Sequence, residues 1–167
     1  MKCIYGCQRV VRNESGKLAH AHPVLIVEGD SVDSGKIVDV QGPAEILTDR
    51  ENQPPEVRRC KDHCHSIWIQ TVSPVSTDGA VVPLRTPETK RIYVCTTVAK
   101  AEPGTYQQGA IIFDSAEGQR TARHLKLLGP SRIIFDEHNP IIGYCPCKQS
   151  HPHRMWIETD GEIELVA

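Results

Sequence analysis

The sequence predicts a mainly β protein, made of two tandem repeats of a small zinc-stapled β-rich module that pack with pseudo-two-fold symmetry. Three observations lead to this prediction. The 167-residue chain aligns with itself in order along nearly its whole length, its apolar residues fall in short runs separated by twelve glycines and twelve prolines, and cysteines and histidines recur in both halves. Short apolar runs between Gly and Pro turns are typical of β-strands.

The internal alignment begins near the N-terminus, where residues 2–7 and 90–95 share four of six residues at an offset of 88 positions. The offset falls to 87 over a second block and returns to 88 over a third, which contains both tryptophans of the chain. The blocks together hold eighteen identities, whereas unrelated segments of this length would share roughly four or five. We therefore expect copy one over residues 1–84, copy two over residues 90–167 and a short polar joint between them.

Strands are expected where apolar and polar residues alternate, or where a short apolar run lies between turn residues. In copy one the expected strands are 24–28, 36–41, 44–48, 67–72 and 80–84. In copy two they are 91–99, 110–114, 132–135, 155–158 and 162–166. Residues 118–128 taken alone would suit a helix, but the alignment favours a strand in their second half. Turns are expected at three Gly-Asp or Asp-Gly pairs: Gly29-Asp30, Asp78-Gly79 and Asp160-Gly161.

Cysteines and histidines that recur in both copies predict one zinc site in each. The expected ligands are Cys7, Cys60, His63 and His65 in copy one, and Cys95, Cys147, His151 and His153 in copy two. Two thiolates and two imidazoles make the closed tetrahedral set that zinc prefers in structural sites. Histidines at alternate positions of an extended segment lie on the same side of it. We therefore expect two zinc ions per chain, each joining the start of a copy to its end, with an iron–sulfur centre as the alternative.

The remaining cysteines and histidines have no counterpart in the other copy: Cys3, Cys64, Cys145, His20, His22, His124 and His138. We expect them to be idle thiols and surface histidines. Two alternatives stay open, a second ion near copy one held by Cys3, His20 and His22, and Cys145 in place of Cys147 as a ligand. Trp68 and Trp156, which follow the last histidine of each set, are expected to be core aromatics.

Composition and charge limit which partners and which cellular compartment we expect. The net charge of −2, with no Lys- or Arg-rich run, disfavours an extended nucleic-acid surface. The apolar runs are too short to span a bilayer, and the N-terminal residues lack the apolar stretch of a signal peptide, so we expect no membrane contact and no secretion. Seven cysteines, an odd number, disfavour a disulfide framework. We expect a reducing compartment, either the cytoplasm or an assembled virion.

A zinc ion with four protein ligands has no open position for water or substrate, so the predicted sites are structural rather than catalytic. We therefore expect a protein that is not an enzyme and that acts through protein partners, as a homo-oligomer or in a larger assembly. A phage-type virion component, in a capsid or tail, is one instance. Two alternatives stay open: a nucleic-acid-binding zinc protein, using the basic residues beside the ligands (Arg58, Arg59, Lys61, Lys148 and Arg154), and a zinc metalloenzyme in which water replaces one ligand.

Overall fold

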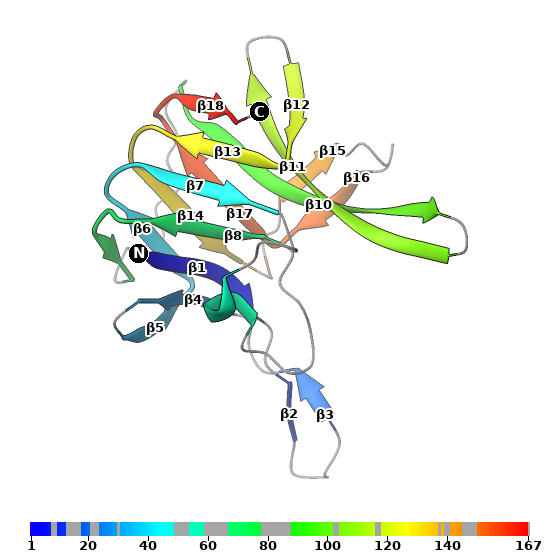
Figure 1. The fold of residues 1–167 in the computed structure, drawn as a ribbon, viewed down its shortest axis with the longest axis horizontal. Coiled ribbons are helices and arrows are strands. Elements are labelled where there is room, and N and C mark those ends of the chain that lie inside the picture. The colour runs from blue at the N-terminus through cyan, green and yellow to red at the C-terminus, as the bar shows by residue number, and fades with distance from the viewer. Residues whose placement is uncertain are drawn as a thin grey trace.

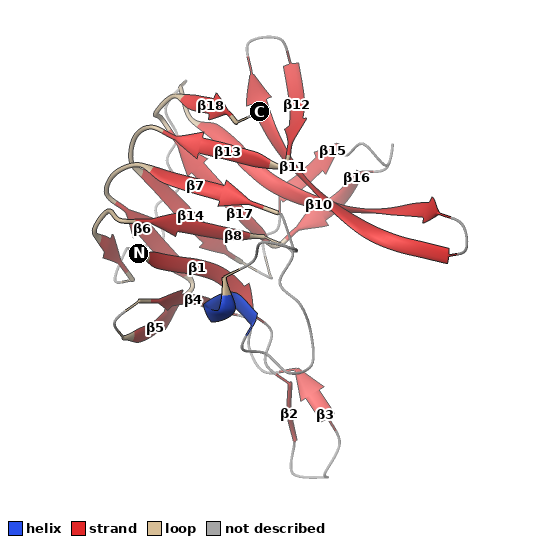
Figure 2. Ribbon diagram, viewed as in Figure 1, coloured by secondary structure: helices blue, strands red, loops and turns tan. Residues whose placement is uncertain are grey.

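A computed structural model describes residues 1–7, 10–12, 18–20, 24–29, 31–48, 54–58, 67–77, 88–101, 104–115, 118–136, 138, 141–144 and 150–166. The backbone alone is described at residues 7, 10–12, 18–20, 24, 56, 58, 95–101, 104–109, 143, 144 and 150–152. Within these ranges the regular structure is β-strand, apart from one short 3-10 helix, η1 (Pro55–Arg58) (Figure 2). The predicted mainly β fold class is confirmed.

Two seven-stranded sheets, counted within the described ranges, form the body of the molecule (Figure 1). The first sheet has the order β18 (Ile163–Leu165), β13 (His124–Leu127), β7 (Ala44–Leu47), β8 (Trp68–Thr71), β1 (Lys2–Cys7), β4 (Val24–Glu28), β5 (Val32–Gly35). The second has the order β12 (Gly118–Ala122), β11 (Gly104–Ser115), β10 (Lys90–Ala101), β17 (Met155–Thr159), β14 (Ser131–Phe135), β6 (Ile37–Val40), β9 (Val75–Ser76). Neighbouring strands in both sheets are antiparallel.

Two small ribbons accompany the sheets. The strand β2 (Val10–Arg12) pairs with β3 (Leu18–His20), and β15 (Ile141–Tyr144) pairs with β16 (Ser150–His153). Figure 1 shows that β2 and β3 lie well away from the body, while β15 and β16 lie beside β10. The ribbon β15–β16, which belongs to predicted copy two, is therefore placed to cover the outer face of the second sheet.

The chain passes repeatedly from one sheet to the other. A single residue, Lys36, separates β5 in the first sheet from β6 in the second, and Arg123 likewise separates β12 from β13. Backbone hydrogen bonds hold both crossings, from Thr48 N to Arg123 O at 3.1 Å and from Phe135 N to Lys36 O at 2.9 Å. As a result each sheet contains strands from both predicted copies. The boundaries 1–84 and 90–167 themselves stay a prediction.

One hydrophobic core joins the two sheets. It is formed by alternate residues of the strands, as the burial of Ala44–Leu47 illustrates, where the core-facing positions are closed to solvent and the intervening ones are partly open. Its fully buried isoleucines are Ile4, Ile46, Ile69, Ile92, Ile111 and Ile133. Each such side chain contributes about 1.5–3 kcal/mol by leaving water. Branched aliphatic residues therefore provide most of the buried apolar surface in a chain with only 5% aromatic residues.

The expected strands are confirmed wherever the structure describes them, with small shifts at their ends; residues 80–84 and the Asp78-Gly79 turn lie outside the described residues. The helix considered for residues 118–128 does not form, because this segment supplies β12 and then β13. Gly118 opens β12 with φ of 103°, a conformation that favours glycine. The strand expected over 110–114 is longer than predicted, since β11 starts at Gly104.

Candidate metal centres and their surroundings

Four of the eight predicted zinc ligands lie outside the part of the chain that the structure describes. They are Cys60, His63, His65 and Cys147. Cys7, Cys95 and His151 are described in the backbone alone, as residues of β1, β10 and β16. Among the side chains that are described, no group of three or more His, Cys, Asp or Glu residues could hold a metal. The two ligand sets therefore stay predictions.

The topology nevertheless places the C-terminal end of β1 beside the start of β8, and β10 in the same way beside β17. In the first sheet Ile4 pairs with Ile69, so β1 runs toward Cys7 as the chain enters β8 from residue 67. In the second sheet Ile92 pairs with Ile157, so β10 runs toward Cys95 as the chain enters β17 from the β16 side. The backbone arrangement is thus the one that the predicted link between the N-terminal cysteine and the downstream histidines requires.

His153 is the predicted ligand whose side chain the structure describes. It is 6% exposed, its Nδ1 lies 3.1 Å from the carbonyl oxygen of Val94, and its ring centroid lies 4.3 Å from that of Tyr93. In a neutral imidazole, donation from Nδ1 to a backbone carbonyl leaves the lone pair on Nε2, which is the arrangement that a zinc-binding histidine commonly has. The contact also anchors β16 to β10 one residue before Cys95.

The extended conformation predicted for the second His-x-His segment is confirmed. His151 and His153 occupy alternate positions of β16, paired with Gly143 and Ile141 of β15. Residues 145–149, which include Cys145 and Cys147, join these two strands and lie outside the described residues. The corresponding segment of copy one, residues 59–66, also lies outside them.

Beneath each ligand-bearing connection lies a buried cluster on the outer face of a sheet. On the first sheet the cluster is Cys3, Tyr5, Ile26 and Trp68, covered by Val57 of η1. On the second sheet it is Tyr93, Ile112, Ile134 and Trp156, with Ile141 of β15 packed against it. Both covering residues belong to the long connections between neighbouring strands, β7 to β8 and β14 to β17. These connections therefore complete the hydrophobic structure as well as carrying the predicted ligands.

Both tryptophans are buried, as predicted for core aromatics, but their indole N–H groups differ. Trp156 Nε1 donates to Glu158 Oε1 at 3.0 Å, and Glu158 is itself 1% exposed. Trp68 Nε1 is buried without an acceptor among the residues that the structure describes. The residue two positions after Trp68 is Gln70, where the second sheet has Glu158.

Several contacts between charged groups were not predicted from the sequence. Arg132 makes a two-point contact with Asp39, with Nε to Oδ1 at 2.6 Å and Nη2 to Oδ2 at 3.3 Å. The hydrogen bond from Arg132 to Asp39 raises the pKa of the guanidinium above its ordinary value; desolvation opposes this, and the charges of Asp39 and Glu158 add to it. On the other side of Glu158, Arg91 Nε lies 3.8 Å from its Oε1. The Trp-x-Glu spacing places both side chains on one face of a strand and could have indicated the buried carboxylate.

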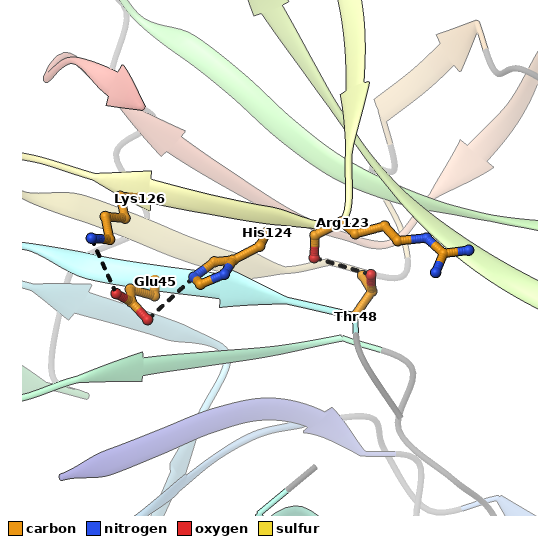
Figure 3. Close-up of polar contacts among 5 residues, drawn as sticks. All are labelled: Glu45, Thr48, Arg123, His124 and Lys126. Carbon is orange, nitrogen blue, oxygen red and sulfur yellow. Dashed lines mark hydrogen bonds and ion pairs between the residues drawn. The ribbon is translucent and has the colours of Figure 1, made fainter. Parts of the chain in front are cut away.

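The first sheet has a more open charged group on β7 and β13 (Figure 3). His124 Nε2 lies 3.2 Å from Glu45 Oε2, and Lys126 Nζ lies 4.0 Å from Glu45 Oε1. Nearby, Thr48 Oγ1 donates to the carbonyl oxygen of Arg123 at 3.2 Å (Figure 3). His124, predicted to be a surface histidine, is half-buried in a contact that joins the two predicted copies.

The other unmatched residues are only partly described. Cys3 is a buried thiol, and His138 is exposed. His20 is described in the backbone of β3 alone, while His22, Cys64 and Cys145 lie outside the described residues. The second ion considered for Cys3, His20 and His22 is therefore still a prediction.

Comparison of the chain with protein-family models, with curated proteins and with solved structures finds no match. In the portion of the chain that the structure describes, no helix has the length and apolar character needed to cross a bilayer.

Proposed function

We propose that this chain is a zinc-stabilised structural protein that acts through contacts with other protein subunits, as a capsid or tail component of a phage-type particle would. The observation that carries the proposal is that the ribbons β2–β3 and β10–β11 extend from the two-sheet body (Figure 1). A two-stranded ribbon by itself is marginally stable in water. Ribbons that leave the body of a subunit are suited to reaching a neighbouring one.

The order of the strands supports a duplicated origin for the body. Each strand of the first sheet has a counterpart at the same place along the other predicted copy, for example β1 with β10, β7 with β14 and β8 with β17. Replacing every strand of the first sheet by its counterpart gives the strand order of the second sheet read from the other edge. A duplicated module whose copies exchange strands would have this arrangement.

The strand registers support the same interpretation. The pair Ile4–Ile69 of the first sheet corresponds to Ile92–Ile157 of the second, and both residues of the pair are displaced by the offset found in the sequence. Side-chain contacts repeat in the same way. Thr71 Oγ1 donates to Pro43 O at 2.8 Å, and Thr159 Oγ1 donates to Pro130 O at 2.8 Å.

The role proposed for zinc is to fix the two long connections over the outer faces. Each connection joins strands that are neighbours in a sheet, and connections of this length are uncommon in compact domains unless something holds them. A zinc ion shared between a connection and the strand of Cys7 or Cys95 would tie down the far end of the loop, and the free energy of metal binding would then stabilise the fold. The contact of His153 with Val94 supports this arrangement in copy two.

Metal content per chain tests the zinc sites. Mass spectrometry of the purified protein should find two zinc ions per chain, and His63→Ala and His153→Ala should each lower the content to one. His124→Ala, a histidine outside both sets, is the matched control and should retain two. A wild-type protein that contains no metal, and whose unfolding transition does not change in strong chelator, would rule the sites out.

Sedimentation velocity over a range of protein concentrations tests the assembly role. We expect the sedimentation coefficient to rise with concentration, because the proposed contacts are between subunits. A chain that stays monomeric at every concentration, and that turns over a substrate or binds nucleic acid with a steep salt dependence, would refute the structural role and favour one of the alternatives.

A further inference from the structure

The outer half of the β10–β11 ribbon has open backbone edges. The pairing of β10 with β11 runs from Ile92 to Ala101, but its pairing with β17 covers only Lys90–Ile92. From Cys95 to Ala101, β10 has no strand partner other than β11 among the residues described. Figure 1 shows this part of the ribbon extending away from both sheets. A row of backbone N–H and C=O groups along such an edge is a template for another strand.

The sequence of this ribbon has few of the features that usually protect an edge, and its single proline, Pro103, stands between the two strands. Charged residues, prolines and bulges are the common means of preventing a strand from being added. Between Cys95 and Ala110 the charged residues are Lys100 and Glu102, both close to the tip. The other ribbon differs, since its sequence from residue 9 to residue 20 contains Arg9, Arg12, Glu14 and Lys17. The β10–β11 ribbon is therefore the better candidate for strand addition.

Of its two edges, that of β10 is the better suited to pairing. Thr96, Thr97 and Val98 are consecutive β-branched residues, which favour strands, whereas β11 has glycine at 104 and 109. Toward the body, the contact of His153 with Val94 O occupies the edge up to that residue. The segment left for a partner is thus Cys95–Ala101, about the length of an ordinary strand.

We infer that β10 pairs in antiparallel fashion with β10 of a second copy of this chain, forming a four-stranded sheet across a two-fold axis. This inference rests on the proposed assembly function and identifies its contact. An antiparallel strand that meets its own copy is self-complementary, so the pairing closes at a dimer. With Val98 at the axis, Lys100 lies opposite Thr96 of the partner subunit, so no like charges meet. A second copy of the chain can therefore pair with the backbone N–H and C=O groups of this edge without an unfavourable charge contact.

Charge substitution at the axis tests the pairing. Val98→Glu and Val98→Lys would each set two like charges opposite one another, and such placement costs enough to weaken a dimer by about tenfold or more. Each variant alone should therefore be monomeric at concentrations where the wild type is dimeric, and an equimolar mixture of the two should dimerise again. Thr121→Glu and Thr121→Lys, on the exposed edge strand β12, are the matched controls and should leave dimerisation unchanged.

Hydrogen exchange of the wild-type chain locates the contact independently. Deuterium uptake of residues 95–101 should fall as the protein concentration rises, while that of residues 104–110 should not. A dimer that persists in both Val98 variants, with uptake of 95–101 unaffected by concentration, would overturn the inference and leave assembly through another surface. A wild-type chain that is monomeric at every concentration would also overturn the inference. The zinc sites are tested independently, by the metal content. Unchanged thermal unfolding of the Val98 variants would show that the body is intact.

Discussion

The outer faces of the two sheets use equivalent strand positions for different chemistry. Across the second sheet, neighbouring positions alternate in charge: Asp39, Arg132, Glu158 and Arg91. Across the first sheet, the equivalent positions are Lys126, Glu45, Gln70 and Cys3. The first pair of each row keeps opposite charges with the signs exchanged, while the second pair is ionic in one sheet and neutral in the other. What is common to both rows is the opposite charge of the first pair rather than the identity of any residue.

The difference has its largest effect on the buried tryptophans. In the second sheet the carboxylate of Glu158 accepts a hydrogen bond from Trp156. In the first sheet the equivalent residue is Gln70, and Trp68 has no acceptor among the residues that the structure describes. One position in a strand thus decides whether the polar atom of a core aromatic is satisfied within the sheet. The predictions below test this comparison, beginning with the largest expected effect.

Trp156→Phe should destabilise the protein more than Trp68→Phe does. Both substitutions remove ring volume, but only the first also removes a hydrogen bond to a buried carboxylate, which is worth about 1.5–3 kcal/mol. Urea unfolding of the two variants measures the difference between their free energies of unfolding. Equal losses would contradict the comparison and would indicate that Trp68 Nε1 has an acceptor in the connection outside the described residues.

The two buried tyrosines extend the comparison. Tyr5 OH donates to Glu28 Oε1 at 2.9 Å, whereas Tyr93 OH accepts from Gln119 Nε2 at 3.1 Å. Hydrogen bonds to charged groups exceed neutral ones by roughly 1 kcal/mol, so Tyr5→Phe should cost about that much more than Tyr93→Phe. Each variant loses one tyrosine hydroxyl and keeps the ring, and thermal unfolding of the two measures the difference in stability. A larger loss for Tyr93→Phe would reverse the expected order.

The ion pairs on the two faces should differ by a smaller amount. Arg132 and Asp39 make a two-point contact and are 17% and 28% exposed, whereas Lys126 and Glu45 approach to 4.0 Å and are 43% and 38% exposed. We expect Asp39→Asn to cost about 1 kcal/mol and Lys126→Gln less than about 0.5 kcal/mol. Chemical denaturation in low and high salt measures both, and a Lys126→Gln loss as large as that of Asp39→Asn would contradict the prediction.

The loss of stability caused by Asp39→Asn should not change with pH on the alkaline side of neutrality. The pKa of Arg132 is raised in the folded state, mainly by its hydrogen bond to Asp39. The stability that comes with a raised pKa is fully present below the unfolded-state pKa, which for arginine is far above neutral pH, and it is lost as the pH rises toward the folded-state pKa. The difference in unfolding free energy between wild type and variant should therefore be constant from about pH 7 to 10. A fall over this range would show that another group controls the pair.

Local sequence features predicted most of the strands but not how they combine. The aligned isoleucines Ile69 and Ile157 occupy the same place in the two sheets, because alternation of apolar residues determines which face of a strand is buried. Nothing in the residues around Lys36 or Arg123 indicates that the next strand joins the other sheet, since the choice depends on packing between distant segments. The first half of β11 was missed, because the Thr, Gln and Gly residues of positions 104–109 do not alternate in polarity.

The candidate sites were predictable to a different degree. Recurrence in the alignment selected the zinc ligands, and the structure describes the side chain of one of them, His153, beside the strand of Cys95. The carboxylate of Glu158 was missed because a glutamate after an apolar pair resembles an ordinary solvent-facing residue. Its neighbours Arg91 and Arg132 lie on the adjacent strands and are far from it in sequence.

Strand exchange between the sheets has a consequence for synthesis. The strand β6 pairs with β9 on one side and with β14 on the other, and the contact of Asp39 with Arg132 of β14 closes a sequence separation of 93 residues. At about 5–20 residues per second, a ribosome takes roughly 5–20 s to supply that partner. During this interval Val38 and Val40 of the nascent chain lack the strand that will pair with theirs. The emerging first half is thus exposed to misassociation, and a holding chaperone would improve the yield of folded chains.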